Sequence, residues 1–187
     1  MGTHPSCFKS YDIRGRVPDE LNADIAYRVG RAYAATLALR GPVVVGRDIR
    51  LSSPALAAAP IAGLNDAGVD TFDIGLCGTE MVYLAAARPG VVGGIMVTAS
   101  HNPVDYNGMK LVREQARPIS GDSGLKRIAD LVAASRFPLQ LVLEAPINPW
   151  MSLTNTSLKY CPLSTGRFWR PCIWVVNAGN GCAGPDF

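Results

Sequence analysis

The sequence is most informative at first in what it lacks. No run of about 20 apolar residues is present, so no segment is a candidate for a membrane helix. The N-terminal residues lack a basic stretch followed by an apolar one, and we therefore do not expect a secretory signal. The five cysteines form no Cys-x-x-Cys pair, which argues against a zinc site and a disulfide framework. These absences favour a cytoplasmic protein without a membrane partner.

Two common catalytic motifs and a basic patch are also missing. The chain has no Gly-x-Ser-x-Gly elbow, so a serine hydrolase triad is not expected. It has no glycine-rich loop ending in Gly-Lys-Ser or Gly-Lys-Thr, which excludes the usual nucleoside triphosphate site. The net charge is +3, and the lysines and arginines are scattered rather than clustered. No stripe of positive charge follows a nucleic-acid backbone, and we expect no nucleic-acid partner.

The pattern of apolar residues predicts alternating helices and strands. Apolar residues are 48% of the chain and charged residues 18%, an ordinary globular composition. The predicted helices span residues 22–40, 52–67, 79–88 and 120–135, and the predicted strands span residues 43–45, 69–76, 94–98 and 109–112. Asn22 is the expected N-cap of the first helix, and Pro54 fits the first turn of the second. Pro60 would bend that second helix or delay its start. The alternation predicts an α/β fold, a layered domain with a mixed, mostly covered sheet flanked by helices.

A short loop after the third predicted strand carries the reactive side chains. Ser100 and His101 follow that strand directly, and Pro103 keeps the loop extended. The pair at 107 and 108 is Asn-Gly, which predicts a tight turn, and Lys110 would begin the next strand. A hydroxyl, an imidazole and an ammonium group therefore converge.

A serine hydroxyl is a poor nucleophile unless a base or a prior modification activates it. A phosphoserine would carry a charge of about −1.5 to −2 at pH 7 and would attract cations. Lys110, a metal ion, or Arg14 in a turn expected at Gly15 would supply them. From the residues alone, the alternatives remain that Ser100 and His101 are solvated loop residues and that Arg14 is a surface charge.

Four motifs, in order, resemble those of the α-D-phosphohexomutases, in particular the bacterial phosphomannomutases and phosphoglucomutases. They are CFKSYDIRG at 7–15, VGRDIRLS at 45–52, DIGLCGTE at 73–80, and TASHNP at 98–103 followed by DYNGMK at 105–110. The resemblance covers about 120 residues. It implies the fold of the first domain of that family, over residues 1–135.

The resemblance also implies a reaction. Ser100 would carry a phosphate, donate it to a hexose 1- or 6-phosphate of mannose or also glucose, and regain the other phosphate from a bisphosphorylated sugar. His101 and Lys110 would act as acid/base and electrostatic residues, and Arg14 would stabilise charge. The implied substrate contacts are Tyr11, Arg14, Ser100, His101, Asn102 and Lys110. The implied cofactor is Mg²⁺, bound through the phosphate of Ser100, with glucose 1,6-bisphosphate or mannose 1,6-bisphosphate as activator.

The remainder of the chain departs from the family pattern. Residues 136–173 are rich in proline and tryptophan and poor in acids, which predicts an atypical connector or a segment read in a shifted frame. Residues 174–187 contain WVVNAGNGCAGP, which resembles the start of the family's second domain. The family's Asp-x-Asp-x-Asp-Arg metal loop, its sugar-reading loop and its phosphate-binding loop are absent, so we expect a fragment that is inactive alone. The alternatives are a non-catalytic domain that binds phosphate weakly and a slow phosphatase.

Overall fold

The computed structural model describes residues 5–137 of the chain. The expected second-domain start lies outside these residues, as does the expected connector beyond residue 137. Within the described range the helices and strands follow one another closely, and their bounds are β1 (Ile13–Arg16), α1 (Ala23–Leu37), β2 (Val43–Arg47), α2 (Ser53–Asp66), β3 (Thr71–Leu76), α3 (Thr79–Ala86), β4 (Gly93–Val97), β5 (Tyr106–Arg113), η1 (Glu114–Ala116), β6 (Arg117–Pro118), η2 (Gly121–Leu125) and α4 (Lys126–Ala134).

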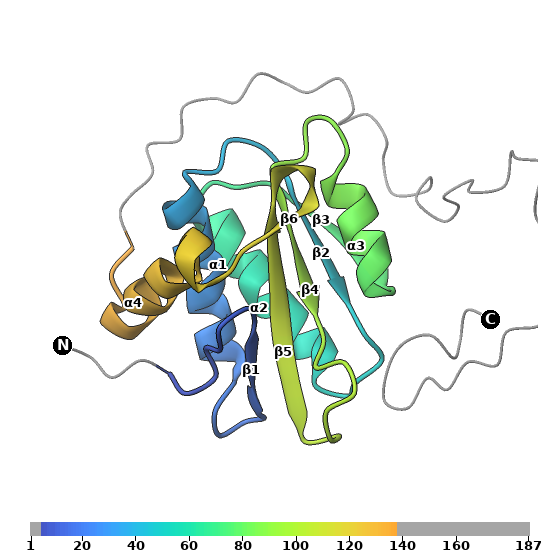
Figure 1. The fold of residues 1–187 in the computed structure, drawn as a ribbon, viewed down its shortest axis with the longest axis vertical. Coiled ribbons are helices and arrows are strands. Elements are labelled where there is room, and N and C mark those ends of the chain that lie inside the picture. The colour runs from blue at the N-terminus through green and yellow to red at the C-terminus, as the bar shows by residue number, and fades with distance from the viewer. Residues whose placement is uncertain (1–4, 138–187) are drawn as a thin grey trace, which may run out of the picture.

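The strands form one mixed sheet between two layers of helices. The order is β1-β5-β4-β2-β3, and β6 pairs with β5 at one end. β2 runs parallel to β3 and β4, whereas β5 is antiparallel to both β1 and β4. Figure 1 shows α1, α2 and α4 on one side of the sheet and α3 on the other. The predicted layered α/β fold with a mixed sheet is confirmed.

The two longest helices, α1 and α2, pack with their backbones unusually close. A Cβ added to Gly30 would lie 2.4 Å from the carbonyl oxygen of Pro60, and one added to Gly63 would lie 2.2 Å from that of Tyr27. α2 begins at Ser53 and continues through Pro60, so the delayed start is wrong. The buried Pro60 contributes to this close helix contact.

The ends of the helices agree with the sequence in several places. The Asn22 side chain accepts a hydrogen bond from the Ile25 N–H at 3.0 Å, which confirms the predicted N-cap. Pro54 lies in the first turn of α2. Among residues 5–137, no helix has the length and apolar character that crossing a membrane requires.

Two turns that the sequence predicts are strands instead. Asn107 and Gly108 lie inside β5, where a Cβ on Gly108 would come within 2.3 Å of the Ile13 carbonyl oxygen. Glycine is needed there because β1 approaches closely, not because the chain reverses. Gly15 likewise lies within β1, and a Cβ on it would meet the Cβ of Glu20 at 2.8 Å. Arg14 therefore projects from a strand rather than from a turn.

Candidate functional site

The loop between β4 and β5 presents Ser100 at the end of the sheet. Ser100 is exposed, and its hydroxyl oxygen lies 3.1 Å from Nδ1 of His101. The backbone of Ser100 has a φ of 54°, in the left-handed region that a residue with a side chain rarely adopts. Asn102 donates from its side-chain amide to the Ala99 carbonyl oxygen at 2.8 Å, which folds the loop onto itself.

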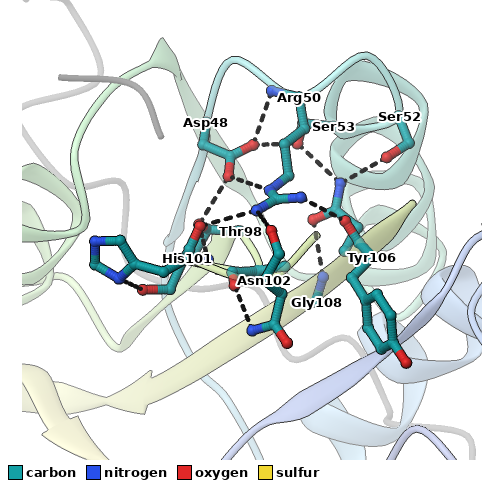
Figure 2. A network of polar contacts seen from close by, with 12 residues as sticks. Asp48, Arg50, Ser52, Ser53, Thr98, His101, Asn102, Tyr106 and Gly108 are labelled. Atoms are coloured by element: carbon teal, nitrogen blue, oxygen red, sulfur yellow. Dashed lines mark hydrogen bonds and ion pairs between the residues drawn. The ribbon is translucent and has the colours of Figure 1, made fainter. Parts of the chain in front are cut away.

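The backbone of this loop is held by one buried arginine. Arg50 is only 3% exposed, and its guanidinium reaches into the loop from the segment between β2 and α2. Figure 2 shows this side chain at the centre of the polar network. Its nitrogens donate to four carbonyl oxygens at 2.7 to 2.9 Å, those of Ser100, Asn102, Pro103 and Tyr106.

Asp48 links the same two segments and carries the opposite charge. One of its oxygens accepts from the Ser53 hydroxyl at 2.5 Å and from the Arg50 N–H at 3.1 Å. The other accepts from the Thr98 hydroxyl at 2.8 Å and lies 3.3 Å from Nε of Arg50. The Thr98 oxygen in turn accepts the Ser100 N–H at 3.0 Å. The carboxylate is 2% exposed, and its pairing with Arg50 offsets much of the cost of burying both charges.

A third link lies at the base of the loop. The buried side chain of Asn107 donates to the hydroxyls of Ser52 and Ser53 at 2.8 and 3.0 Å. Its amide oxygen accepts the Gly108 N–H at 2.8 Å. The loop that bears Ser100 is thus fastened to the start of α2 at both of its ends (Figure 2).

The predicted cations gather on a neighbouring part of the sheet around a carboxylate. Asp12 accepts a hydrogen bond from Arg14 at 2.5 Å and lies 3.9 Å from the Lys110 ammonium. Lys110 is paired with Met96 on β4, and Met96 packs against Val82 of α3. Because paired residues point to one face, these cations lie on the face that α3 covers.

The candidate residues therefore form two groups. Ser100, His101 and Asn102 share the loop, whereas Arg14 and Lys110 share Asp12. Among residues 5–137, no hydrogen bond joins the Ser100 hydroxyl to either cation. Tyr11 is 80% exposed, beside this second group in the sequence. The catalytic and binding roles assigned to these residues stay predictions.

Sequence reasoning assigned no role in the site to Asp12, Asp48, Arg50 or Thr98. The motif at 45–52 was recognised, but it gave no sign that its charges turn inward to the serine loop. Buried charged residues that lie about 50 positions from their partners in the sequence leave no periodic signal. A pattern of Asp-x-Arg directly after an apolar strand is the available clue.

Metal ligands are scarce in the part of the chain that the structure describes. No group of three or more His, Cys, Asp or Glu side chains lies close enough to hold an ion there. Ser100, through a phosphate, would be a single ligand. The sequence assigned Mg²⁺ only this one ligand within the chain, and the binding of Mg²⁺ stays a prediction.

Comparison with known proteins gives concordant matches. The family described as phosphoglucomutase/phosphomannomutase, alpha/beta/alpha domain I, matches residues 5–138. A phosphomannomutase of Escherichia coli is 49% identical over 191 residues, covering 97% of this chain and 40% of that protein. A protein of Xanthomonas campestris named phosphohexose mutases is 55% identical over 183 residues, covering 95% of this chain and 39% of the relative.

Solved structures agree on the fold. A phosphoglucomutase/phosphomannomutase family protein from Burkholderia thailandensis superposes with a TM-score of 0.66 at 39% identity. The match covers 73% of this chain and 31% of that one. The chain thus spans about 40% of the length of the phosphomannomutase of Escherichia coli and of the Xanthomonas campestris relative.

Proposed function

Because the chain belongs to the phosphoglucomutase/phosphomannomutase family, we propose that it carries the phosphoserine of a mutase that interconverts hexose 6-phosphate and hexose 1-phosphate. Relatives named phosphomannomutase and phosphohexose mutases are isomerases that act on sugar phosphates. The observation that carries the proposal is the exposed Ser100 hydroxyl, 3.1 Å from an imidazole, on a loop fixed from below by Arg50. Residues 1–135 would be the phosphoserine domain, with divisions at 135 and 173 as part of the proposal.

The first step transfers a phosphoryl group from Ser100 to the sugar. The bond between phosphorus and Oγ of Ser100 breaks, and a bond forms to the free hydroxyl of a hexose monophosphate. The proton of that hydroxyl moves to a base, and Oγ of Ser100 takes up a proton. His101 is placed beside Oγ to exchange this proton.

The second step is the reverse transfer from the other end of the sugar. The bisphosphorylated intermediate turns over, its second phosphate is transferred to Ser100, and a hexose phosphate with the phosphate moved is released. Mannose and glucose phosphates are the proposed substrates, and glucose 1,6-bisphosphate or mannose 1,6-bisphosphate would load an unphosphorylated Ser100. A cytoplasmic location is part of the same proposal.

Phosphoryl transfer depends mainly on in-line positioning and on stabilising charge on the transferred oxygens. Arg14 offers a planar fork and Lys110 a point charge on the face next to the loop, with Asp12 holding both. Mg²⁺ bound to the phosphoserine would supply Lewis-acid stabilisation, and its other ligands would have to come from outside residues 5–137.

The test is intact-mass spectrometry of the chain after incubation with glucose 1,6-bisphosphate and Mg²⁺. Ser100→Ala is the matched control. A gain of one phosphate that is absent from the control supports the proposal. No gain by a folded chain favours the non-catalytic alternative. Gain followed by release of inorganic phosphate favours the phosphatase alternative, so free phosphate is measured in the same samples.

A further inference from the structure

We propose that Asp48, Arg50 and Thr98 form a clamp that fixes Ser100 for phosphoryl transfer, so that these three act as positioning residues. The inference rests on the proposed role of Ser100 as phosphate carrier. The clamp joins the segment before α2 to the loop after β4, and both segments lie at the carboxyl ends of neighbouring parallel strands.

The partners of Arg50 indicate its task. The two terminal nitrogens of its guanidinium donate to four main-chain carbonyl oxygens of the serine loop and the start of β5, those of Ser100, Asn102, Pro103 and Tyr106. A buried arginine that served packing alone would be replaceable by an apolar side chain. A planar fork that reaches four carbonyl groups instead dictates the path of the backbone between them.

The path that it dictates includes the unusual conformation of Ser100. The carbonyl group of Ser100 is held by Arg50 at 2.8 Å, and its N–H is held by the Thr98 hydroxyl at 3.0 Å. The φ of 54° lies between these two fixed groups. With both backbone groups of Ser100 held, rotation about its Cα–Cβ bond is the principal freedom left to the hydroxyl.

Asp48 orients both Thr98 and Arg50 toward the serine loop. Its carboxylate accepts a hydrogen bond from the Thr98 hydroxyl, which leaves a lone pair of the Thr98 oxygen facing the Ser100 N–H. The same carboxylate oxygen lies 3.3 Å from Nε of Arg50 and balances the charge of the guanidinium. Holding a reacting group in place before the substrate arrives removes an entropic cost from the transfer step. The clamp should therefore raise the maximal transfer rate and leave sugar affinity unchanged.

The test uses the full chain in four variants. Arg50→Lys keeps the charge but cannot reach four carbonyl groups. Thr98→Val removes the hydroxyl with little change in shape, and Thr98→Ser restores it. Arg47→Ala is the matched control. Arg47 is the last residue of β2, close to Arg50 in the sequence, but it pairs with Asp73 at 3.4 Å rather than with the loop.

The first readout is amide hydrogen exchange over residues 98–105, compared with exchange of the β2 and β5 core. We expect faster loop exchange, with an unchanged core, in Arg50→Lys and Thr98→Val. Thr98→Ser should recover the protection, and Arg47→Ala should keep it. Loop protection equal to wild type in a folded Thr98→Val chain would overturn the clamp, even if Arg50→Lys fails to fold.

The second readout is the rate of Ser100 phosphorylation as glucose 1,6-bisphosphate is varied. We expect the maximal rate to fall about tenfold or more in Thr98→Val, with the half-saturating concentration unchanged. A change in half-saturation alone contradicts a positioning role. If wild type takes up no phosphate, the proposed function fails for this chain, while hydrogen exchange still decides whether the clamp exists.

Discussion

The carboxylate of Asp12 accepts a 2.5 Å hydrogen bond from the guanidinium of Arg14. The same oxygen lies 3.9 Å from the ammonium of Lys110. Arg14 belongs to β1 and Lys110 to β5, two adjacent antiparallel strands. A carboxylate between two cations lowers their mutual repulsion and sets their direction. Asp12 therefore holds together the two cations that we propose to act on a phosphate carried by Ser100.

Asp12→Asn should slow phosphorylation of Ser100 by about ten- to a hundredfold, because the two cations lose their common anchor. Stability to urea should change by less than about 1 kcal/mol, because the Arg14 and Lys110 side chains are partly exposed. Mass spectrometry and urea unfolding measure the two effects. Asp24→Asn removes an ion pair with Arg28 on α1 and serves as control. An unchanged phosphorylation rate in Asp12→Asn would contradict the role of Asp12.

The left-handed backbone of Ser100 gives a prediction about stability. Ser100→Gly and Ser100→Ala both remove the hydroxyl, but only glycine adopts a φ of 54° without strain. The glycine variant should be more stable than the alanine variant by up to about 1 kcal/mol, after its greater freedom in the unfolded chain is subtracted. Urea unfolding of the two variants measures the difference. A more stable alanine variant would count against this backbone geometry.

Gly108 is expected to tolerate no side chain. A Cβ there would lie 2.3 Å from the Ile13 carbonyl oxygen and 2.9 Å from that of Thr98. Gly108→Ala should destabilise the domain by about 3 kcal/mol, because backbone rather than a movable side chain must give way. Gly121→Ala is the control, since the Cβ would approach only the Ser10 carbonyl oxygen, at 3.6 Å. Similar unfolding midpoints for the two variants would refute the close approach of β1 and β5.

The buried thiol of Cys7 should make the folded domain less stable as the pH becomes alkaline. Burial raises the pKa of its thiol from 9.0 to about 11. Between these values the unfolded chain loses the proton and the folded chain keeps it, so stability falls as pH rises from 9 to 11. The decline should reach about 2–3 kcal/mol. Below pH 9 the thiol is protonated in both states and contributes no slope.

The matched comparison is Cys7→Ala, unfolded in urea at several pH values. The variant should be less stable than wild type at pH 8, and the difference should shrink toward pH 11. The buried Tyr33 hydroxyl, whose pKa is also raised by burial, is present in both chains and cancels. A difference that stays constant with pH would show that Cys7 does not titrate in this range.

The sequence predicted the layers well and the close contacts poorly. Apolar periodicity located α1, which buries one face over many residues, whereas the cap and turn residues at 52–54 and 68 located α2. The turn predicted from the Asn-Gly pair at 107 and 108 was wrong, because a glycine that favours a turn also permits close contact between strands. The side chain of Asn107 is directed inward by Ser52 and Ser53, which lie far from it in sequence.

The candidate site likewise contains residues that the sequence identified and residues that it did not. Ser100 and His101 are neighbours along the chain, so a local motif found them. Arg50 reaches the loop across about 50 positions, as the hydrogen bond to the Ser100 carbonyl shows. No local pattern encodes that pairing, because it arises from the parallel arrangement of β2 and β4. The fold had to be known before the clamp was visible.

The two oxygens of Asp48 have an evolutionary consequence. One serves the start of α2 through Ser53, and the other serves the serine loop through Thr98. An apolar replacement at position 48 would remove the acceptor to which two hydroxyl groups in separate segments donate, so no single second substitution could repair it. Changes at 53 and 98 should then be non-additive with changes at 48, and drifting lineages would be expected to keep all three together or to replace them as a set.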